Sequence, residues 1–496
     1  MSIPRQGRSP AVALDELNAL RADDAPVHGG RVLAYVYDAG LADVTDAGLR
    51  ALADFGEVNA LDPTVFPSVG RIENDLVGWG LDLLGGAEAS CGVVTSGGTE
   101  SCLLAVLAGR EDWRRRGGQG QPVLVMPVTA HPAFAKAAHL LGLRLRFVPV
   151  DGGSMRVRAA DVATALDEEG TAVALVVVSS PSYAHGVVDP VAEVAAIAAA
   201  RGVPCHSDAC IGGLVLPYLR RSGRDIPDFD LSVPGVRSLS VDLHKYGFAP
   251  KGTSLLLFSD AEYRSGTYFT YSSWPGYPVV NTTLQSTKSA GPMAAAWVVS
   301  RALGDEGYAA AADRAIRATD LVVDAVGSLP GLRVLGPPDS TLVAIAAEGA
   351  EADGGVDPFV LADRMRARGW FIQPQPAFAD LPRTVHLTMQ PTSIDTVDEF
   401  VVDLQRSAAE CAGAPWAAAD PALLAAASDL EAATLDEATV AGLLAFAGLV
   451  GDGGAGLPDE AAGIQALLES LPDPLRDRLL AGFFSLVFSA RRGPDA

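Results

Sequence analysis

Short apolar runs alternate with amphipathic segments through the middle of the chain. Between residues 70 and 260 the apolar runs predict strands at 123–127, 144–150, 172–178, 203–206, 236–241 and 254–258. Helical periodicity lies between them, at 72–84, 100–110, 133–141 and 191–200. Continuous apolar strands that alternate with helices are typical of a parallel sheet covered on both faces. The pattern therefore predicts an α/β fold.

Other patterns flank this central part. Residues 1–69 form an N-terminal segment with a helix expected at 44–55, and residues 70–300 form the large domain. A smaller α/β domain is predicted at 301–412, with strands at 341–346 and 384–388 and helices at 358–368 and 394–410. Helices at 293–303 and 308–329 join the two domains. The Ala-rich residues 413–496 predict a helical extension.

The composition excludes several classes of protein. Hydrophobic residues make up 49% of the chain, which supplies a sizeable core. The formal charge of −23 argues against binding to nucleic acid or to an anionic membrane. No apolar run reaches the length of about 18 residues that a membrane-spanning helix needs. We therefore expect a soluble, cytoplasmic protein. Five scattered cysteines without a Cys-x-x-Cys pair predict neither disulfides nor a metal site.

Lysine is rare in this chain. Only Lys136, Lys245, Lys251 and Lys288 occur among 37 basic residues. An arginine cannot lose its proton and form an imine, whereas a lysine can. Codon bias would also make lysine rare, so each lysine needs support from the residues around it.

The run Thr-Ser-Gly-Gly-Thr-Glu-Ser at 95–101 precedes a strong helix. Gly97 and Gly98 let a ligand approach the backbone, Thr99 adds a hydroxyl, and a helix N-terminus favours an anion. This arrangement suits a phosphate monoester. A Gly-Gly turn capped by threonine, without a ligand, is the alternative.

Two further motifs follow predicted strands. His131 comes after the strand at 123–127, where an imidazole could stack on a planar ring. Asp208 ends the run that starts at 203, with Cys210 two residues later, and its carboxylate could keep a ring nitrogen protonated. The alternatives are a histidine at a helix start and an aspartate in a turn.

Lys245 ends the run Ser-Leu-Ser-Val-Asp-Leu-His-Lys at 238–245. Beside His244, and near Lys251, its ammonium form is expected to be disfavoured, which leaves a free amine for imine formation. Two solvated basic residues are the alternative. A phosphate loop, a stacking ring, a ring-nitrogen carboxylate and an imine-forming lysine are together what pyridoxal 5′-phosphate needs.

Several long runs resemble one known family. TSGGTES, HPAFAKAA, HSDACIGG and SLSVDLHKYGFAPKG are similar to the sphingosine-1-phosphate lyase branch of the group II pyridoxal-phosphate-dependent decarboxylases. The resemblance implies the aminotransferase fold type I, with a mostly parallel seven-stranded sheet in the large domain. It also implies a homodimer with active sites at the subunit boundary.

The resemblance also implies roles for individual residues. Lys245 would form the Schiff base, Asp208 would pair with the pyridinium, and His131 would stack on the ring. The phosphate would be held by Gly98, Thr99 and His244. Gly97, beside Gly98, and Cys210, two residues after Asp208, would also contact the cofactor. The substrate pocket would include Tyr37, Asn59 and Lys251.

Two positions depart from the family pattern. Asp62 stands where the lyases have histidine, and Lys288 stands where they have arginine. Both would face the substrate, and a carboxylate there repels a phosphate while lysine binds it only as a point charge. These exchanges disfavour a phosphorylated substrate.

We expect a lyase that breaks a bond to Cα of an amine through an external aldimine. Retro-aldol cleavage of Cα–Cβ, which releases an aldehyde, is the leading interpretation. Decarboxylation of an L-amino acid is the alternative, because both reactions use the same electron sink. A catalytically silent binding subunit with the same fold is a third possibility.

Overall fold

A sheet of seven strands forms the centre of the larger lobe. The computed structural model describes residues 3–489 except 429, 431, 433, 434, 452, 453, 456, 457 and 459. The strand order is β1-β7-β6-β5-β4-β2-β3. The strands are β1 (Cys91–Thr95), β2 (Val123–Pro127), β3 (Arg144–Val148), β4 (Val173–Ser179), β5 (Cys205–Asp208), β6 (Val236–Val241) and β7 (Ser254–Phe258). All pairs from β3 to β6 are parallel, while β7 runs antiparallel to both of its neighbours.

Helices cover this sheet. They are α3 (Pro67–Leu83), α4 (Gly98–Arg115), α5 (Ala133–Leu141), α6 (Ala159–Glu169), α7 (Val191–Ala199), α8 (Leu216–Arg221) and α9 (Ala261–Ser265). Every residue of β4 is buried, as an apolar strand between two helical layers requires. The predicted α/β fold with a mostly parallel seven-stranded sheet is confirmed.

Some predicted boundaries were wrong for identifiable reasons. The strand β1 was missed, because it is short and contains a glycine. Helix α3 begins at Pro67 instead of residue 72, because proline is well suited to the first helical position. By contrast, the break predicted between the helices at 293–303 and 308–329 is confirmed: both lie in α10 (Gly291–Gly327), whose backbone leaves the helical conformation at Gly304. Gly304 has a φ of 61°, which explains a glycine there.

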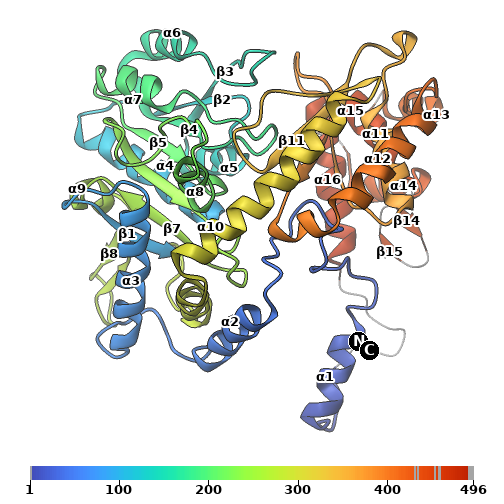
Figure 1. Cartoon of the computed structure of the whole chain (residues 1–496). Coiled ribbons are helices and arrows are strands. Elements are labelled where there is room, and N and C mark those ends of the chain that lie inside the picture. The colour runs from blue at the N-terminus through green and yellow to red at the C-terminus, as the bar shows by residue number, and fades with distance from the viewer. Residues whose placement is uncertain are drawn as a thin grey trace.

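A second sheet lies in the smaller lobe. Its order is β10-β11-β13-β12, and all of its pairs are antiparallel. The elements of this lobe are β10 (Leu332–Val334), β11 (Leu342–Ala347), β12 (Gln373–Gln375), β13 (Thr384–Thr388), α11 (Pro358–Ala367) and α12 (Val397–Cys411). Helix α10 runs between the two lobes (Figure 1) and passes through residue 300, where the sequence analysis ended the large domain.

The chain ends in a helical unit, here called the C-terminal extension (described residues between 413 and 489). Its helices are α13 (Pro421–Ser428), α14 (Glu437–Phe446), α15 (Ala462–Ser470) and α16 (Asp473–Val487), and a short hairpin joins β14 (Val450–Gly451) to β15 (Gly454–Ala455). The end of the predicted helical stretch, 490–496, lies outside the described residues. Near the N-terminus are α1 (Pro10–Ala19), which has no buried residue, and α2 (Ala42–Asp54), which packs against α10.

Within the described part of the chain, none of the helices is both long enough and apolar enough to cross a membrane.

Candidate active site

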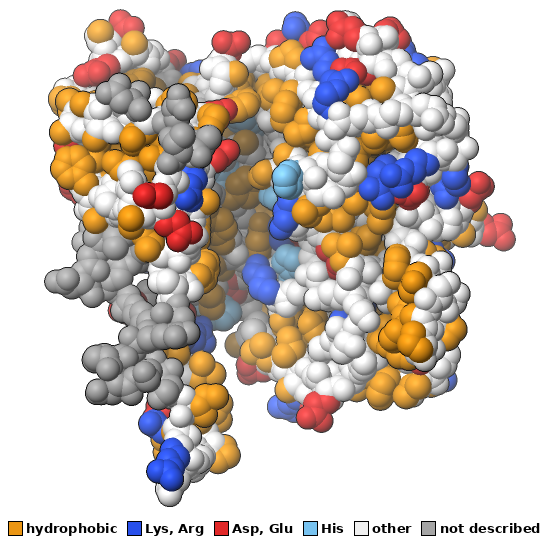
Figure 2. Space-filling view, turned by 180° about the vertical axis from the view of Figure 1, so that it is seen from behind, with side chains coloured by type: hydrophobic (Ala, Val, Ile, Leu, Met, Phe, Trp, Pro, Cys, Tyr) orange, Lys and Arg blue, Asp and Glu red, His pale blue; other side chains and the backbone are white. Residues whose placement is uncertain are grey.

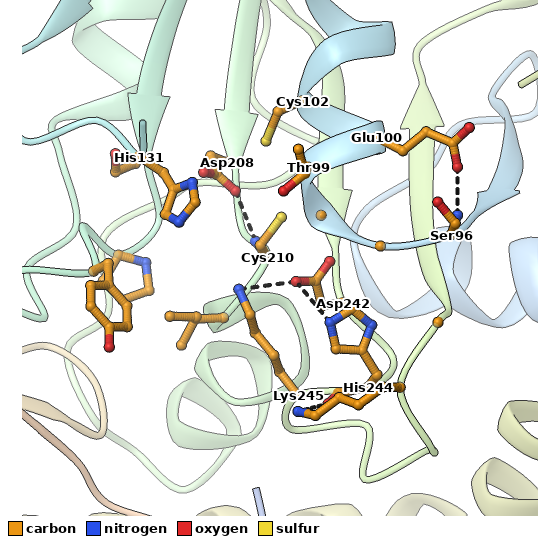
Figure 3. A pocket seen from close by; sticks show the side chains of 18 residues that line it. Ser96, Thr99, Glu100, Cys102, His131, Asp208, Cys210, Asp242, His244 and Lys245 are labelled. Atoms are coloured by element: carbon orange, nitrogen blue, oxygen red, sulfur yellow. Dashed lines mark hydrogen bonds and ion pairs between the residues drawn. The ribbon is translucent and has the colours of Figure 1, made fainter. Parts of the chain in front are cut away.

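The motif residues meet at one edge of the large sheet. His131, Asp208 and Lys245 follow or end β2, β5 and β6, and the carboxyl ends of parallel strands share an edge. The loop that contains Gly97 follows β1 at the same edge. All of these residues line a single cavity of about 440 Å³ (Figure 3). The structure therefore brings together the residues that the sequence analysis assigned to a cofactor.

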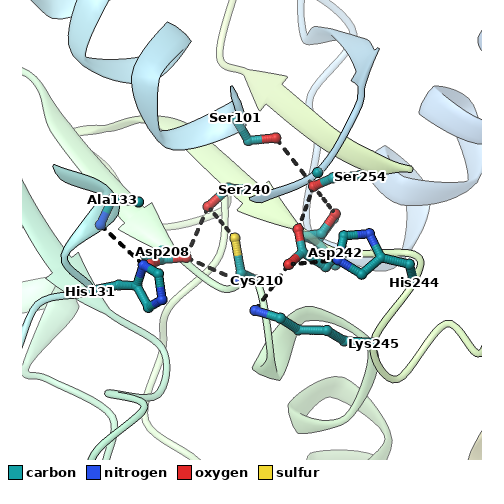
Figure 4. A network of polar contacts seen from close by, with 12 residues as sticks. Ser101, His131, Ala133, Asp208, Cys210, Ser240, Asp242, His244, Lys245 and Ser254 are labelled. Carbon is teal, nitrogen blue, oxygen red and sulfur yellow. Dashed lines mark hydrogen bonds and ion pairs between the residues drawn. The ribbon is translucent and has the colours of Figure 1, made fainter. Parts of the chain in front are cut away.

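The carboxylate of Asp208 is held in place by two hydrogen bonds. Its Oδ1 accepts from the Ser240 hydroxyl at 3.0 Å and from the Cys210 backbone N–H at 3.1 Å (Figure 4). The side chain is 8% exposed, so water reaches it only from the cavity. A fixed, buried carboxylate of this kind is suited to hold a proton on a heterocyclic nitrogen.

Asp242 controls the charge of Lys245. Nζ of Lys245 lies 2.9 Å from Oδ2 of Asp242, whose side chain is 1% exposed. Burial alone would lower the pKa of Lys245, but the carboxylate of Asp242, with smaller contributions from other groups, raises it well above its usual value. The prediction of a disfavoured ammonium form is therefore wrong. It considered His244 and Lys251 but not the carboxylate three residues earlier.

The same interactions keep Asp242 ionised. Burial would raise its pKa, but the charge of Lys245, with smaller contributions from His244 and from hydrogen bonds, lowers it overall. Ser254 also donates a hydrogen bond to its Oδ1 at 2.6 Å. Asp242 is thus a functional residue that the sequence analysis missed. Its position at the end of β6, on the same motif as Lys245, was the available signal.

His131 is a neutral ring at the wall of the cavity. Burial lowers its pKa, and its Nδ1 accepts a hydrogen bond from the backbone N–H of Ala133 at 3.2 Å. That bond fixes the proton on Nε2. The ring meets Tyr183 edge-on at 6.5 Å between centroids. His131 can therefore offer an uncharged face to a planar ring.

The glycine that begins α4 leaves no room for a side chain. A Cβ at Gly98 would lie 2.7 Å from Oδ2 of Asp242 and 2.9 Å from Sγ of Cys210. Helix α4 begins at Gly98, so its first N–H groups, including that of Thr99, have no acceptor within the helix. Gly97 has a φ of 150°. This loop fits a phosphate, and with Lys245 the donor set fits pyridoxal phosphate.

His244 is oriented by the backbone. Its Nδ1 donates to the Thr253 carbonyl at 2.7 Å, and its Nε2 lies 3.8 Å from Oδ2 of Asp242. Burial lowers its pKa. The Cβ position of Gly97 is 3.2 Å from Cε1 of His244, so the imidazole lies beside the glycine loop.

Two thiols complete the floor of the cavity. The ligand atoms of Cys102, Asp208 and Cys210 all lie within 4.8 Å of one another. The hydrogen bond with Cys102 and burial raise the pKa of Cys210 well above its usual value. Both thiols are free and buried, and they pack as small side chains beside Asp208.

A larger cavity of about 640 Å³ opens beside the first one. The two share His131, Tyr183, His244, Lys245 and Lys251. Figure 2 shows the hollow between the two lobes, with basic and histidine side chains on its walls. The far wall comes from the smaller lobe, at Gln373 and the residues up to Thr384. A substrate that reaches Lys245 from outside can therefore pass between the lobes.

Tyr37 and Lys251 both line this larger cavity. Nζ of Lys251 donates to the carbonyls of His244 at 3.2 Å and Tyr35 at 3.4 Å. It also lies 4.9 Å from the centre of the Tyr37 ring. Burial, followed by the charge of Lys245, lowers the pKa of Lys251.

The other three expected substrate residues lie elsewhere in the protomer. Asp62 and Lys288 line a third cavity of about 650 Å³, which shares no lining residue with the first two. Asp62 accepts hydrogen bonds from Thr64, and Asn59 accepts one from the backbone N–H of Leu61 at 3.0 Å. Within one chain these residues do not meet Lys245.

Tyr183 and Gln373 were also missed as site residues. The Tyr183 hydroxyl donates to Oε1 of Gln373 at 2.6 Å, and Nε2 of Gln373 donates to the Tyr35 hydroxyl at 2.7 Å. This bridge joins three segments that are far apart in the sequence. Only the tertiary structure could reveal this bridge.

Comparison with known sequences agrees with this geometry. Residues 51–344 match the family described as "Pyridoxal-dependent decarboxylase conserved domain". The sphingosine-1-phosphate lyase of Arabidopsis thaliana is 34% identical over 72% of this chain, and the match spans 64% of that protein. The lyase of Dictyostelium discoideum is 31% identical over 82% of this chain and 74% of its own length. A "Probable L-tyrosine/L-aspartate decarboxylase" of Methanothermobacter thermautotrophicus is 31% identical over 69% of this chain and 88% of its own length.

Solved structures share the fold. The sphingosine-1-phosphate lyase of Burkholderia pseudomallei superposes with a TM-score of 0.77 at 34% identity, over 83% of this chain and 93% of that one. Glutamate decarboxylase of Lactobacillus brevis has a TM-score of 0.73 at 20% identity, over 83% of this chain and 95% of its own. Residues 421–486 match a second family, "Pyridoxal-dependent enzyme, C-terminal putative HTH domain". Together with the cavity that joins Lys245 to Asp208, these matches show that the chain belongs to the pyridoxal-dependent decarboxylase family.

Proposed function

We propose that this protein is a pyridoxal-phosphate-dependent aldehyde lyase that cleaves the Cα–Cβ bond of a β-hydroxy amine. The observation that carries the proposal is the single cavity lined by Lys245, Asp208 and His131, open to the larger cavity between the lobes. The similarity to sphingosine-1-phosphate lyases over most of the chain supports this reaction.

Each residue of the cavity has a defined task. Lys245 would hold the cofactor covalently, and Asp208 would keep a proton on its ring nitrogen. His131 would pack on the ring face, while the loop of Gly97, Gly98 and Thr99 would bind the phosphate with help from His244. Pyridoxal phosphate, when bound, supplies a cationic ring that accepts the electron pair of a bond broken at Cα.

Lys251 and Tyr37 act on the substrate. Cleavage of Cα–Cβ requires a group that removes the proton of the β-hydroxyl. Lys251 fits this role because burial lowers its pKa and its backbone contacts hold it beside the cavity. Tyr37 packs against Tyr246 with 5.2 Å between centroids, which fixes the wall next to Lys251.

Decarboxylation remains the second candidate. Asp62 and Lys288 differ from the lyase pattern, and the archaeal relative is named as an amino acid decarboxylase. An α-carboxylate would then leave as carbon dioxide from the same cavity. The two reactions release different products, so one experiment separates them.

The purified enzyme should release aldehyde, without carbon dioxide, from at least one amino alcohol. The panel contains sphingosine 1-phosphate, sphingosine, and L-amino acids including tyrosine, aspartate and glutamate. Aldehyde is trapped as a hydrazone, and carbon dioxide is measured from carboxyl-labelled substrates. Carbon dioxide without aldehyde would establish the decarboxylase instead. The absence of both products would indicate a silent binding protein.

We also propose that the enzyme works as a homodimer. An exposed apolar segment borders the third cavity, and its β8 (Phe269–Tyr271) and β9 (Val279–Asn281) form a short hairpin. Its side chains Phe269, Tyr271, Trp274, Tyr277, Val280 and Leu284 are each 43–61% exposed. A contiguous exposed apolar surface of this kind marks an interface. In a dimer, Asp62 and Lys288 could reach the active site of the other subunit.

Light scattering should give twice the mass of one chain. Val280→Asp should shift the protein toward the mass of one chain, because a buried charge destabilises an interface. Leu140→Asp, at an equally exposed leucine on α5 (58%, against 54% for Val280), is the matched control and should leave the mass unchanged. A wild-type protein that has the mass of a single chain at every concentration would contradict the dimer.

The match to a helix-turn-helix family does not make nucleic acid a probable partner, because residues 421–486 contain two arginines, no lysine and ten acidic residues. Binding to a phosphate backbone requires clustered positive charge. We propose instead that the extension acts within the enzyme.

A further inference from the structure

A proline-rich loop of the smaller lobe forms the outer wall of the larger cavity. This loop, here called the wall loop, consists of residues 376–383 and joins β12 to β13. Pro376, Phe378, Leu381 and Pro382 line the cavity that also contains Lys245. Phe378 and Leu381 close the loop through two backbone hydrogen bonds of 3.0 and 2.9 Å. Its shape therefore affects how the distal part of a substrate fits.

One carboxylate of the C-terminal extension holds both ends of the wall loop. Oε1 of Glu469, on α15, accepts a hydrogen bond from the backbone N–H of Ala377 at 2.7 Å. Its Oε2 accepts from the guanidinium of Arg383. The two side chains are 16% and 15% exposed, so water competes weakly for these bonds.

The position of Glu469 is unfavourable for the helix itself. Glu469 is the penultimate residue of α15, where the helix dipole disfavours a negative charge. The contacts with Ala377 and Arg383 compensate for this cost. The side chain therefore serves the contact with the wall loop and not the stability of its own helix.

Arg383 is a junction between the extension and the smaller lobe. It also contacts Asp357, the N-cap of α11, at 3.2 Å, and lies over the Phe359 ring at 4.5 Å from its centre. Asp357 in turn accepts from the backbone N–H of Ala417 at 2.6 Å. One cation thus lies between two carboxylates, and it keeps one partner if Glu469 is replaced.

A second attachment fixes α15. The carboxylate of Asp363, on α11, accepts hydrogen bonds from the backbone N–H groups of Ala461 and Ala462 at 3.0 and 2.9 Å. These are the first groups of α15, which lack acceptors within the helix. Both ends of α15 are therefore attached to the smaller lobe, so the backbone at Glu469 is held in place.

We propose that Glu469 is a positioning residue for the substrate cavity, through which the C-terminal extension sets the geometry of the wall loop. This inference rests on the proposed function, since it assigns the larger cavity to the substrate. Glu469 touches neither Lys245 nor the cofactor cavity. Its loss should weaken the binding of substrates that reach the wall loop and leave the chemical step intact.

The test compares Glu469→Ala, Glu469→Gln and the control Glu460→Ala in the full-length holoenzyme. Glu460 belongs to the same extension but is 78% exposed, and it forms a surface ion pair with Arg364 at 3.5 Å. With sphingosine 1-phosphate, Glu469→Ala should raise KM about tenfold with kcat nearly unchanged, because hydrogen bonds to a charged group are lost. Glu469→Gln keeps an acceptor for Ala377 and should recover part of the effect. Glu460→Ala should match the wild type.

Two readouts separate positioning from general damage. Phosphoethanolamine, the short amine that cleavage would release, does not reach the wall loop, so its affinity, followed by the visible spectrum, should not change. Amide hydrogen exchange at residues 376–383 should become faster in Glu469→Ala and stay unchanged in Glu460→Ala. An unchanged KM with unchanged exchange would overturn the inference, as would an equal loss for both ligands.

The exchange measurement does not depend on turnover. If the wild-type enzyme releases aldehyde from no amino alcohol of the panel, the proposed reaction fails, and faster exchange in Glu469→Ala alone would still support the positioning role of Glu469. If turnover is present but amide hydrogen exchange at residues 376–383 is the same in all variants, the positioning role of Glu469 is refuted and the proposed reaction stands.

Discussion

Lys245→Ala is expected to remove the visible absorption of the enzyme together with its turnover. The amine is the group that the cavity offers for covalent attachment of the cofactor, and alanine has none. Turnover should fall by several orders of magnitude, because all later steps depend on the correctly held cofactor. Absorbance spectra and product assays of the purified variant measure both effects.

Lys136→Ala is the matched control for this experiment. Lys136 is exposed on α5 and does not line the cavity, so its loss should leave colour and turnover unchanged. A Lys245→Ala enzyme that keeps both its colour and its turnover would refute the assignment of this lysine.

Asp208→Asn should lower kcat by roughly 10²–10⁴-fold, the usual contribution of a positioned proton-holding group. The amide oxygen can still accept the hydrogen bonds from Ser240 and Cys210, so the fold should be retained. It cannot stabilise a protonated ring nitrogen, because it has no negative charge. Steady-state kinetics with the best substrate of the panel, at full cofactor occupancy, measure the effect.

Asp161→Asn provides the control, since Asp161 pairs with Arg158 on the surface of α6. Its kcat should equal that of the wild type. If Asp208→Asn also keeps the wild-type kcat while the cofactor remains bound, the ring nitrogen does not depend on this carboxylate.

The central strands could be predicted because burial on both faces selects continuous apolar runs, as in β2 and β4. The direction of a strand could not be predicted from its apolar residues. The antiparallel pairing of β7 depends on the short connection from β6 through Lys245 and Gly252, not on its composition. The strand β12 is Gln-Pro-Gln, which has no strand pattern, so it emerges only from its pairing with β13.

The chemistry-bearing residues at strand ends were similarly accessible, because Lys245, Asp208 and His131 each follow an apolar run. The protonation state of Lys245 could not be predicted from the sequence, because it depends on the distance to Asp242 and on the burial of both groups. The position of the wall loop beside Lys245 could not be predicted from the sequence either. The loop consists of residues 376–383, which approach Lys245 only after the two lobes have folded together.

The ion pair between Lys245 and Asp242 has a thermodynamic consequence for assembly of the holoenzyme. A lysine attacks an aldehyde only as the neutral amine, and the high pKa of this one means that its proton must first be surrendered. Cofactor uptake is therefore linked to the release of that proton, and we expect uptake to be faster in alkaline buffer, where a larger fraction of the amine is neutral. The carboxylate that secures the amine in its place is thus also the group that holds the proton which must leave before the cofactor can be attached.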